Sequence, residues 1–183
     1  MTNENLFPAL RDGEKEFLHH LHARGAKYVV FGSHAVLLYS PDRELGGAND
    51  LDVVVEYGKE NAVKVFAAAR ACGVKPAEGE TEEDCIAALS QPNKILRFPY
   101  GGPIEVMTST KSEVLLFDDL WRDPRLVSIS VAVGGEISEF KVPFVTKAHL
   151  MQLKQEAIDD QTRKEKSERD RMDLEDLRRS PYC

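Results

Sequence analysis

Hydrophobic and polar positions along the chain repeat with two different periods. Apolar residues at helical spacing predict helices over residues 14–24, 59–72, 81–90 and 112–121, a short helix starting at Ser33, and a helical segment from Thr146 onward. Short runs rich in β-branched and aromatic residues predict strands at 28–31, 51–57, 94–100, 103–109, 126–133 and 137–145. The last four strands form two predicted hairpins, because turn residues separate the members of each pair. The pattern indicates an α/β (α+β) fold with a mixed sheet flanked by helices and a helical C-terminal tail.

Three local features refine this pattern. In the helix over 59–72, the spacing predicts that Val63, Phe66 and Ala67 face the core. Thr81 is predicted to cap the helix over 81–90, with Asp84 in the capping-box position, and Ser112 is predicted to cap the helix over 112–121. The whole chain is divided into a predicted core, residues 1–145, and a C-terminal helical segment, residues 146–183, that packs on it.

Composition narrows the class of protein. The 183 residues are 42% hydrophobic and 30% charged, which is typical of a globular protein with one domain or one domain and a small appendage. No apolar run has the length of a membrane helix, and the first residues lack the order of a signal peptide, so we expect a cytoplasmic protein. A net charge of −7 argues against a generally basic nucleic-acid-binding surface. The three cysteines have neither metal-site nor disulfide spacing.

Acidic residues stand at the start of the most apolar strand. Asp50 and Asp52 are two residues apart, so their carboxylates project from the same face of that strand. A divalent cation relieves the repulsion between two such carboxylates, and Mg²⁺ or Mn²⁺ would then hold a bound phosphate. Glu105 stands in the strand over 103–109 and completes a three-carboxylate metal site if that strand lies beside the first. The alternatives are that the aspartates face water and that Glu105 lies on an exposed edge strand.

A glycine and a serine precede the first short helix. Gly32 lets a phosphate approach the backbone, and the N–H groups at a helix start attract anions, to which the Ser33 hydroxyl can add a hydrogen bond. The alternative is that Ser33 is an ordinary N-cap.

Together the segments FGSHAVLLY, NDLDVVV and IEVMT resemble the nucleotidyltransferase superfamily with the polymerase-beta-like fold. The chain is most similar to minimal nucleotidyltransferases and AbiEii-type toxin proteins, whose tail motifs resemble Lys154–Ala157 and the segment around Asp173 and Asp176. Sixteen residues separate Ser33 from Asp50, more than is usual in that family, and Arg43 is displaced from the family position.

The resemblance implies Mg²⁺-dependent transfer of a nucleoside monophosphate from a nucleoside triphosphate, ATP among them, to a hydroxyl of RNA, a protein or a small molecule. Gly32 and Ser33 would bind the triphosphate, Asp50 and Asp52 the metal, and Glu105 would activate the acceptor. Lys154 would contact a phosphate, or else it is a solvent-facing helix lysine. Asp173 would join the site, or else Asp173 and Asp176 pair with Arg169, Arg171 or Arg179 on their own helix.

A toxin with an antitoxin partner is one implied role. A catalytically inactive nucleotide-binding or protein-interaction member of the same fold, and a metal-dependent hydrolase, are the alternatives.

Overall fold

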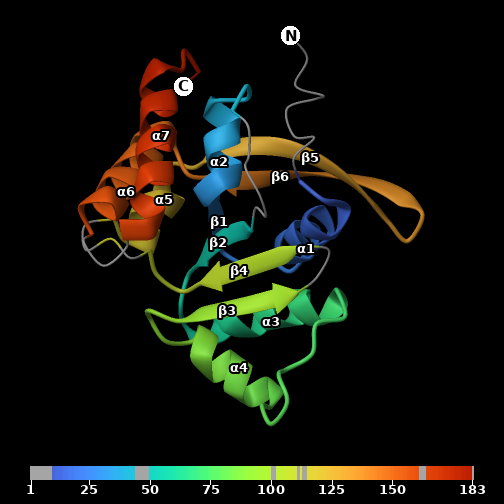
Figure 1. Ribbon diagram of the computed structural model, residues 1–183. Helices are drawn as coiled ribbons and strands as arrows, with labels where there is room; N and C mark the ends of the chain where they lie inside the picture. The colour runs from blue at the N-terminus through green and yellow to red at the C-terminus, as the bar shows by residue number, and fades with distance from the viewer. Residues whose placement is uncertain are drawn as a thin grey trace.

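The computed structural model describes residues 10–43, 50–99, 102–110, 112, 115–160 and 164–182, without the side chains of 99 and 164–167. The described strands are β1 (Tyr28–Phe31), β2 (Leu51–Val55), β3 (Ile95–Pro99), β4 (Pro103–Met107), β5 (Arg125–Val133) and β6 (Glu136–Phe144). The described helices are α1 (Asp12–Ala23), α2 (Gly32–Tyr39), α3 (Lys59–Ala71), α4 (Glu82–Leu89), α5 (Phe117–Arg122), α6 (Lys147–Asp159) and α7 (Lys164–Arg179). The predicted mixed α/β class is confirmed, including the helical C-terminal tail (Figure 1).

One six-stranded sheet organises the described residues, in the order β3-β4-β2-β1-β6-β5. β1 is antiparallel to β2 and parallel to β6, and β2 is parallel to β4. The pairs β3/β4 and β5/β6 are antiparallel, as the two predicted hairpins require. The condition that the strands of Asp50 and Glu105 lie side by side is therefore met, because β2 and β4 are paired in parallel.

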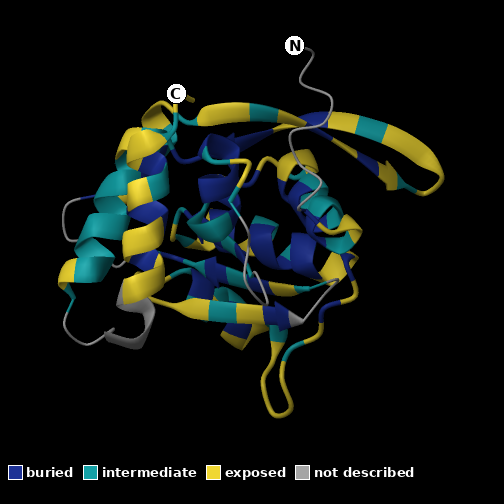
Figure 2. Cartoon of the chain, turned by 45° about the horizontal axis from the view of Figure 1, so that its top comes forward, coloured by how far each residue is buried: buried dark blue, intermediate teal, exposed yellow. Residues whose placement is uncertain are grey.

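The centre of the sheet is the most deeply buried part of the fold. Val53, Val54 and Val55 in β2 are fully buried, and so are Phe17, Leu18 and Leu21 of α1. Figure 2 shows this buried interior between the helices and an exposed outer layer. β2 is thus a rigid support for any side chain at its start.

The predicted core face of α3 is partly wrong. Phe66 is buried, but Val63 is 45% exposed and Ala67 is only partly buried. Ala62, Val65 and Ala69 lie with Phe66 against the core. Small alanines at almost every turn let this helix pack closely through a face that large-residue spacing does not reveal.

Helix starts follow capping chemistry in one case and depart from it in another. The Thr81 side chain accepts from the Asp84 N–H at 3.1 Å while the Asp84 carboxylate accepts from the Thr81 N–H at 2.9 Å, which confirms the predicted capping box. Ser112 does not cap α5, which begins at Phe117. Its hydroxyl instead accepts from the Leu115 N–H at 2.8 Å, and the Asp119 carboxylate accepts from the Leu116 N–H at 3.1 Å at the true helix start.

The hairpin of β5 and β6 projects beyond the helices (Figure 1). Its outer part is largely exposed, with Ile137 82% exposed, and β5 forms one edge of the sheet. Among the helices that the structure describes, none combines the length and the apolar character needed to span a bilayer.

Candidate phosphate and metal site

Strand direction brings the predicted site residues to one end of the sheet. Because β1 and β2 run antiparallel, the end of β1 lies at the start of β2, with Phe31 opposite Asp52. Because β2 and β4 run parallel, Asp52 is also beside Glu105. Gly32 and Ser33 follow Phe31 directly at the start of α2. Residues far apart in the sequence therefore meet where α2 begins.

Gly32 fits closely against Asp52. Its φ of +66° lies in the left-handed region, which side chains strongly disfavour. A Cβ at this position would overlap the Asp52 carboxylate. The absence of a side chain therefore lets the backbone at the start of α2 lie directly against the Asp52 carboxylate.

Ser33 is not the N-cap of α2. That position belongs to Phe31, whose side chain makes no capping hydrogen bond, so the interpretation of Ser33 as an ordinary cap is wrong. The Ser33 hydroxyl instead accepts a hydrogen bond from Nη2 of Arg169 on α7, at 3.4 Å. The predicted phosphate-binding serine thus lies beside an arginine that sequence spacing alone did not place there.

The carboxylates of this end of the sheet are half-buried. Asp50 directly precedes β2, and Asp52 and Glu105 lie within adjacent strands. β4 is an inner strand, and the Glu105 side chain is 16% exposed, so the edge-strand alternative for Glu105 is wrong. Glu105 pairs with Arg97 of β3, with Arg97 Nε and Glu105 Oε1 2.6 Å apart. The hydrogen bond that Arg97 donates to this carboxylate raises the pKa of Arg97.

The donor atoms suit a hard cation only in part. Carboxylate oxygens from two neighbouring strands are the ligands that Mg²⁺ prefers. Within residues that the structure describes, no three His, Cys, Asp or Glu side chains are placed to hold a metal ion together. Asp50, Asp52 and Glu105 all carry such oxygens, and the Glu105 carboxylate is also paired with Arg97.

Lys154 lies in a network of charges, which we call the α7 charge network: Arg43, Lys154, Asp170, Asp173 and Asp176. The Lys154 Nζ atom lies 2.7 Å from both Asp170 Oδ1 and Asp173 Oδ2, and its side chain is 13% exposed. The solvent-facing alternative for Lys154 is therefore wrong.

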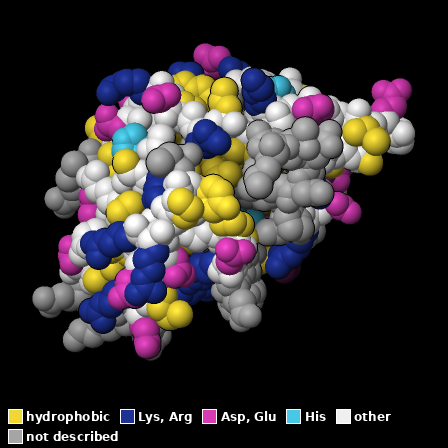
Figure 3. Space-filling view, turned by 90° about the horizontal axis from the view of Figure 1, so that it is seen from above, with side chains coloured by type: hydrophobic (Ala, Val, Ile, Leu, Met, Phe, Trp, Pro, Cys, Tyr) yellow, Lys and Arg dark blue, Asp and Glu magenta, His cyan; other side chains and the backbone are white. Residues whose placement is uncertain are grey.

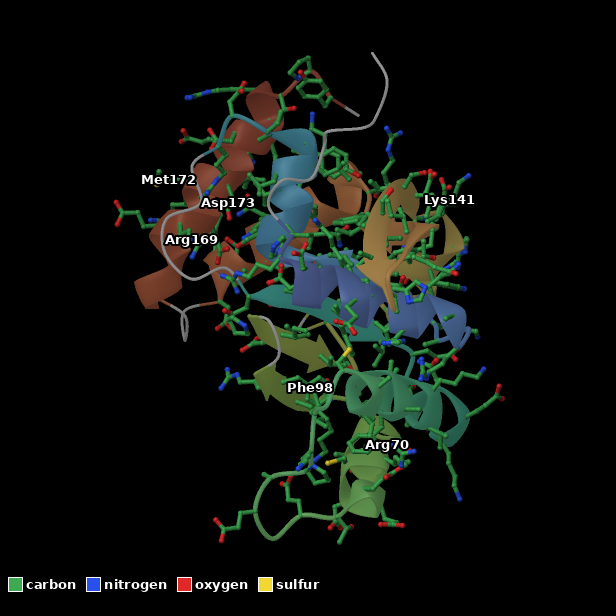
Figure 4. The ribbon with its side chains drawn as sticks, turned by 90° about the vertical axis from the view of Figure 1, so that its right-hand side faces the viewer. Arg70, Phe98, Lys141, Arg169, Met172 and Asp173 are labelled. Atoms are coloured by element: carbon green, nitrogen blue, oxygen red, sulfur yellow. The ribbon has the colours of Figure 1, made fainter. Side chains whose placement is uncertain are left out.

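The aspartates of α7 find partners outside their own helix. Asp173 pairs with Arg43, which also approaches Asp176 at 3.5 Å, and with Lys154 of α6. Asp173 thus pairs with basic side chains of two other elements. Its buried carboxylate joins α6, α7 and the segment that follows α2 (Figure 4).

Sequence reasoning missed a buried pair behind the site. His34 Nε2 lies 3.6 Å from Glu14 Oε2, and both side chains are almost fully buried. The Arg11 N–H donates to Glu14 Oε2 at 2.8 Å, and burial raises the pKa of Glu14, with the Asp50 charge acting in the same direction. An acid three residues after the start of a helix was the available signal, and it predicts a cap rather than a site.

Comparisons with models of known protein families, with curated proteins and with solved structures find no match to this chain. The functional argument therefore depends on the geometry of the site and on the resemblance of its motifs.

Proposed function

We propose that the chain is a Mg²⁺-dependent nucleotidyltransferase of the cytoplasm, which moves a nucleoside monophosphate from a nucleoside triphosphate to an acceptor hydroxyl. The observation that carries the proposal is the strand register that puts Asp52 beside both Phe31 and Glu105. This register is consistent with a site in which the glycine-serine motif, the paired aspartates and the third acid are neighbours in space.

The chain's own groups would divide the work as follows. The N–H groups at the start of α2 and the Ser33 hydroxyl would bind the triphosphate, and Arg169 would add positive charge there. Mg²⁺ held by Asp50 and Asp52 would neutralise phosphate charge as the pyrophosphate leaves. The acceptor oxygen forms a bond to the α-phosphorus while the bond from that phosphorus to the bridging oxygen breaks. Glu105, once released from Arg97, would take the proton of the acceptor hydroxyl.

A label-transfer assay tests the proposal. The protein is incubated with each α-labelled triphosphate, Mg²⁺ and total cellular RNA or protein, and label in the acceptor is measured. We expect transfer from at least one triphosphate, and its loss in the double variant Asp50→Ala with Asp52→Ala. Glu139→Ala, an exposed acid on the distant β6 hairpin, is the matched control and should keep full transfer. Transfer that persists in the double variant would remove these aspartates from the mechanism.

A second function is favoured by a specific observation. Glu105 is paired with Arg97, and Lys154 is paired with two aspartates, so two of the predicted site side chains have protein partners. A catalytically inactive nucleotide-binding or protein-interaction member of the fold would have this arrangement. Mg²⁺-dependent triphosphate binding without transfer to any acceptor identifies it.

The motif resemblance also supports a toxin role with an antitoxin partner. Expression of the chain should then arrest growth of its host cell, and the Asp50→Ala with Asp52→Ala variant should not. Equal growth of cells that express either protein would contradict the toxin role, but it would not bear on the proposed transfer reaction.

A further inference from the structure

A pocket of about 660 Å³ lies between α7 and the segment that follows α2. Its α7 wall is formed by Arg169, Met172, Asp176 and Arg179, which are spaced to share one helix face. Figure 4 shows Arg169 and Met172 along this helix. The volume falls in the range that binds small organic ligands.

The pocket is more positive than the chain around it. Three arginines and two aspartates line it: Arg43, Arg169, Arg179, Asp42 and Asp176. The whole chain, in contrast, has a net charge of −7. A local excess of arginine in an acidic protein favours an anionic ligand, since guanidinium groups bind phosphate oxygens in pairs.

Arg179 is available to such a ligand at low cost. It pairs with Glu175 one helical turn away, at 3.3 Å, with side chains that are 77% and 62% exposed. Exposed pairs of this kind contribute little to stability, so a phosphate can replace the carboxylate. Arg43, by comparison, is held by Asp173 and Asp176 and forms a fixed wall.

Apolar surface lies between and beside these charges. Met172 is 58% exposed and Tyr182 is 53% exposed, and both line the pocket. Figure 3 shows this end of the molecule, where hydrophobic side chains lie among basic and acidic ones. A flat ring can stack on a tyrosine and pack against a thioether, which is the usual way proteins hold a base.

One end of the pocket reaches the candidate site. Arg169 lines the pocket and also donates to the Ser33 hydroxyl. A ligand in the pocket therefore lies next to the position where the proposed function puts the triphosphate, with the same arginine between them.

We propose that this pocket binds a nucleotide as the acceptor, with its phosphate at Arg169 or Arg179 and its base on Tyr182 and Met172. The word acceptor rests on the proposed function, whereas the ligand chemistry rests on the pocket alone. A free mononucleotide and the end of a polynucleotide strand supply the same chemistry, and the experiment separates them.

The test is isothermal titration of the full chain with 5′-AMP in EDTA, which requires neither metal nor turnover. We expect saturable binding, and about tenfold weaker binding for either Arg169→Ala or Arg179→Ala, because the arginine that holds the phosphate makes charged hydrogen bonds to it. Arg178→Ala is the matched control, since Arg178 is an exposed neighbour on α7 outside the pocket lining, and its affinity should be unchanged. Adenosine, which lacks the phosphate, should bind at least tenfold more weakly than 5′-AMP.

Three results would overturn the inference: no 5′-AMP binding, equal affinity in wild type and both pocket variants, or displacement of 5′-AMP by saturating Mg²⁺-ATP. The last result would assign the pocket to the donor nucleotide. A short oligoadenylate that binds more tightly than 5′-AMP supports a strand end, and preferential binding of 5′-AMP supports a free nucleotide.

The outcomes remain distinct from those of the transfer assay. The Asp50→Ala with Asp52→Ala variant should keep 5′-AMP binding while losing transfer. Transfer without 5′-AMP binding would reject the pocket alone, and 5′-AMP binding without any transfer would reject the enzyme and its acceptor while leaving the ligand class standing.

Discussion

A single substitution at Gly32 should disturb the candidate site. In Gly32→Ala the new Cβ overlaps the Asp52 carboxylate, and the φ of +66° disfavours any side chain. We expect transfer to fall at least about tenfold as Asp52 is displaced, and the free energy of unfolding to fall by roughly 1–3 kcal/mol. The measurements are label transfer and urea denaturation.

Gly25 provides a matched control for that change. Its φ is +61°, but a Cβ there would meet nothing within 4 Å. Gly25→Ala should therefore cost only about 1 kcal/mol of backbone strain and leave transfer intact. Equal loss of transfer in both variants would show that Gly32 acts through backbone strain and not through Asp52.

Arg97 is predicted to restrain Glu105. In Arg97→Ala the Glu105 carboxylate loses its partner at 2.6 Å and can turn toward Asp52. We expect transfer to rise if the chain is an active nucleotidyltransferase, with little change in the free energy of unfolding because Arg97 is mostly exposed.

The control for Arg97 is Arg70→Ala, which breaks another exposed pair, with Glu82 at 2.9 Å, away from the site. Transfer should be unchanged in this variant. Unchanged transfer in Arg97→Ala as well would mean that the pair with Glu105 does not limit catalysis.

At this scale the sequence predicts some partners and not others. Asp50 and Asp52 share a face because side chains two residues apart in a strand project to the same side, and this depends only on local geometry. Arg97 lies opposite Glu105 only through hairpin register, and Glu14 meets His34 only through packing of α1 against the start of α2. Such contacts depend on the assembled fold, so one sequence without relatives does not reveal them.

Among the elements, α7 depends most on charge. Lys154→Met removes the cation between Asp170 and Asp173 and leaves two buried carboxylates together. We expect the free energy of unfolding to fall by about 3 kcal/mol, since breaking a buried ion pair leaves an uncompensated charge. Urea denaturation measures this loss.

Lys64→Met is the control, because Lys64 pairs with Glu60 one turn away at a more exposed site, at 2.8 Å. Its loss should be under about 1 kcal/mol. Similar stability in Lys154→Met and Lys64→Met would show that the α7 charge network contributes little to holding α7.

Element type was easier to predict than element contacts. Alternating apolar residues and turn glycines were sufficient for both hairpins, and a threonine three residues before an aspartate was sufficient for the α4 cap. The buried face of α3 could not be predicted in this way, because alanines occur on several of its faces and do not indicate which one packs on the core. The partners of Lys154 could not be predicted either, because they lie on a different helix.

For the molecule as a whole, we expect Glu14 to make the free energy of unfolding depend on pH. Burial raises the pKa of Glu14 above its ordinary value of 4.5, so the folded chain holds a proton that the unfolded chain releases. The contribution of Glu14 to stability therefore falls as pH rises from 4.5 through its folded pKa. The groups around it are Arg11 and Lys15, which oppose the shift, Asp50, which adds to it, and His34 at 3.6 Å.

Glu14→Gln removes this proton linkage. The stability of the variant relative to wild type should increase with pH across that window and level off above it. Urea unfolding of both proteins at several pH values measures the difference. A parallel pair of curves for Glu14→Gln and wild type would contradict the linkage.

The contact between Arg169 and Ser33 determines when, during synthesis of the chain, the candidate site can be completed. These residues are 136 positions apart, Ser180 and Tyr39 are 141 apart, and β1 gains β6 as its second neighbour only at Phe144. During synthesis, the acids of β2 and β4 emerge long before the arginine that would accompany them. Contacts of such long sequence separation form slowly. A nascent chain therefore carries an uncovered β1 edge until β6 has emerged, and an unfinished site until α7 has left the ribosome.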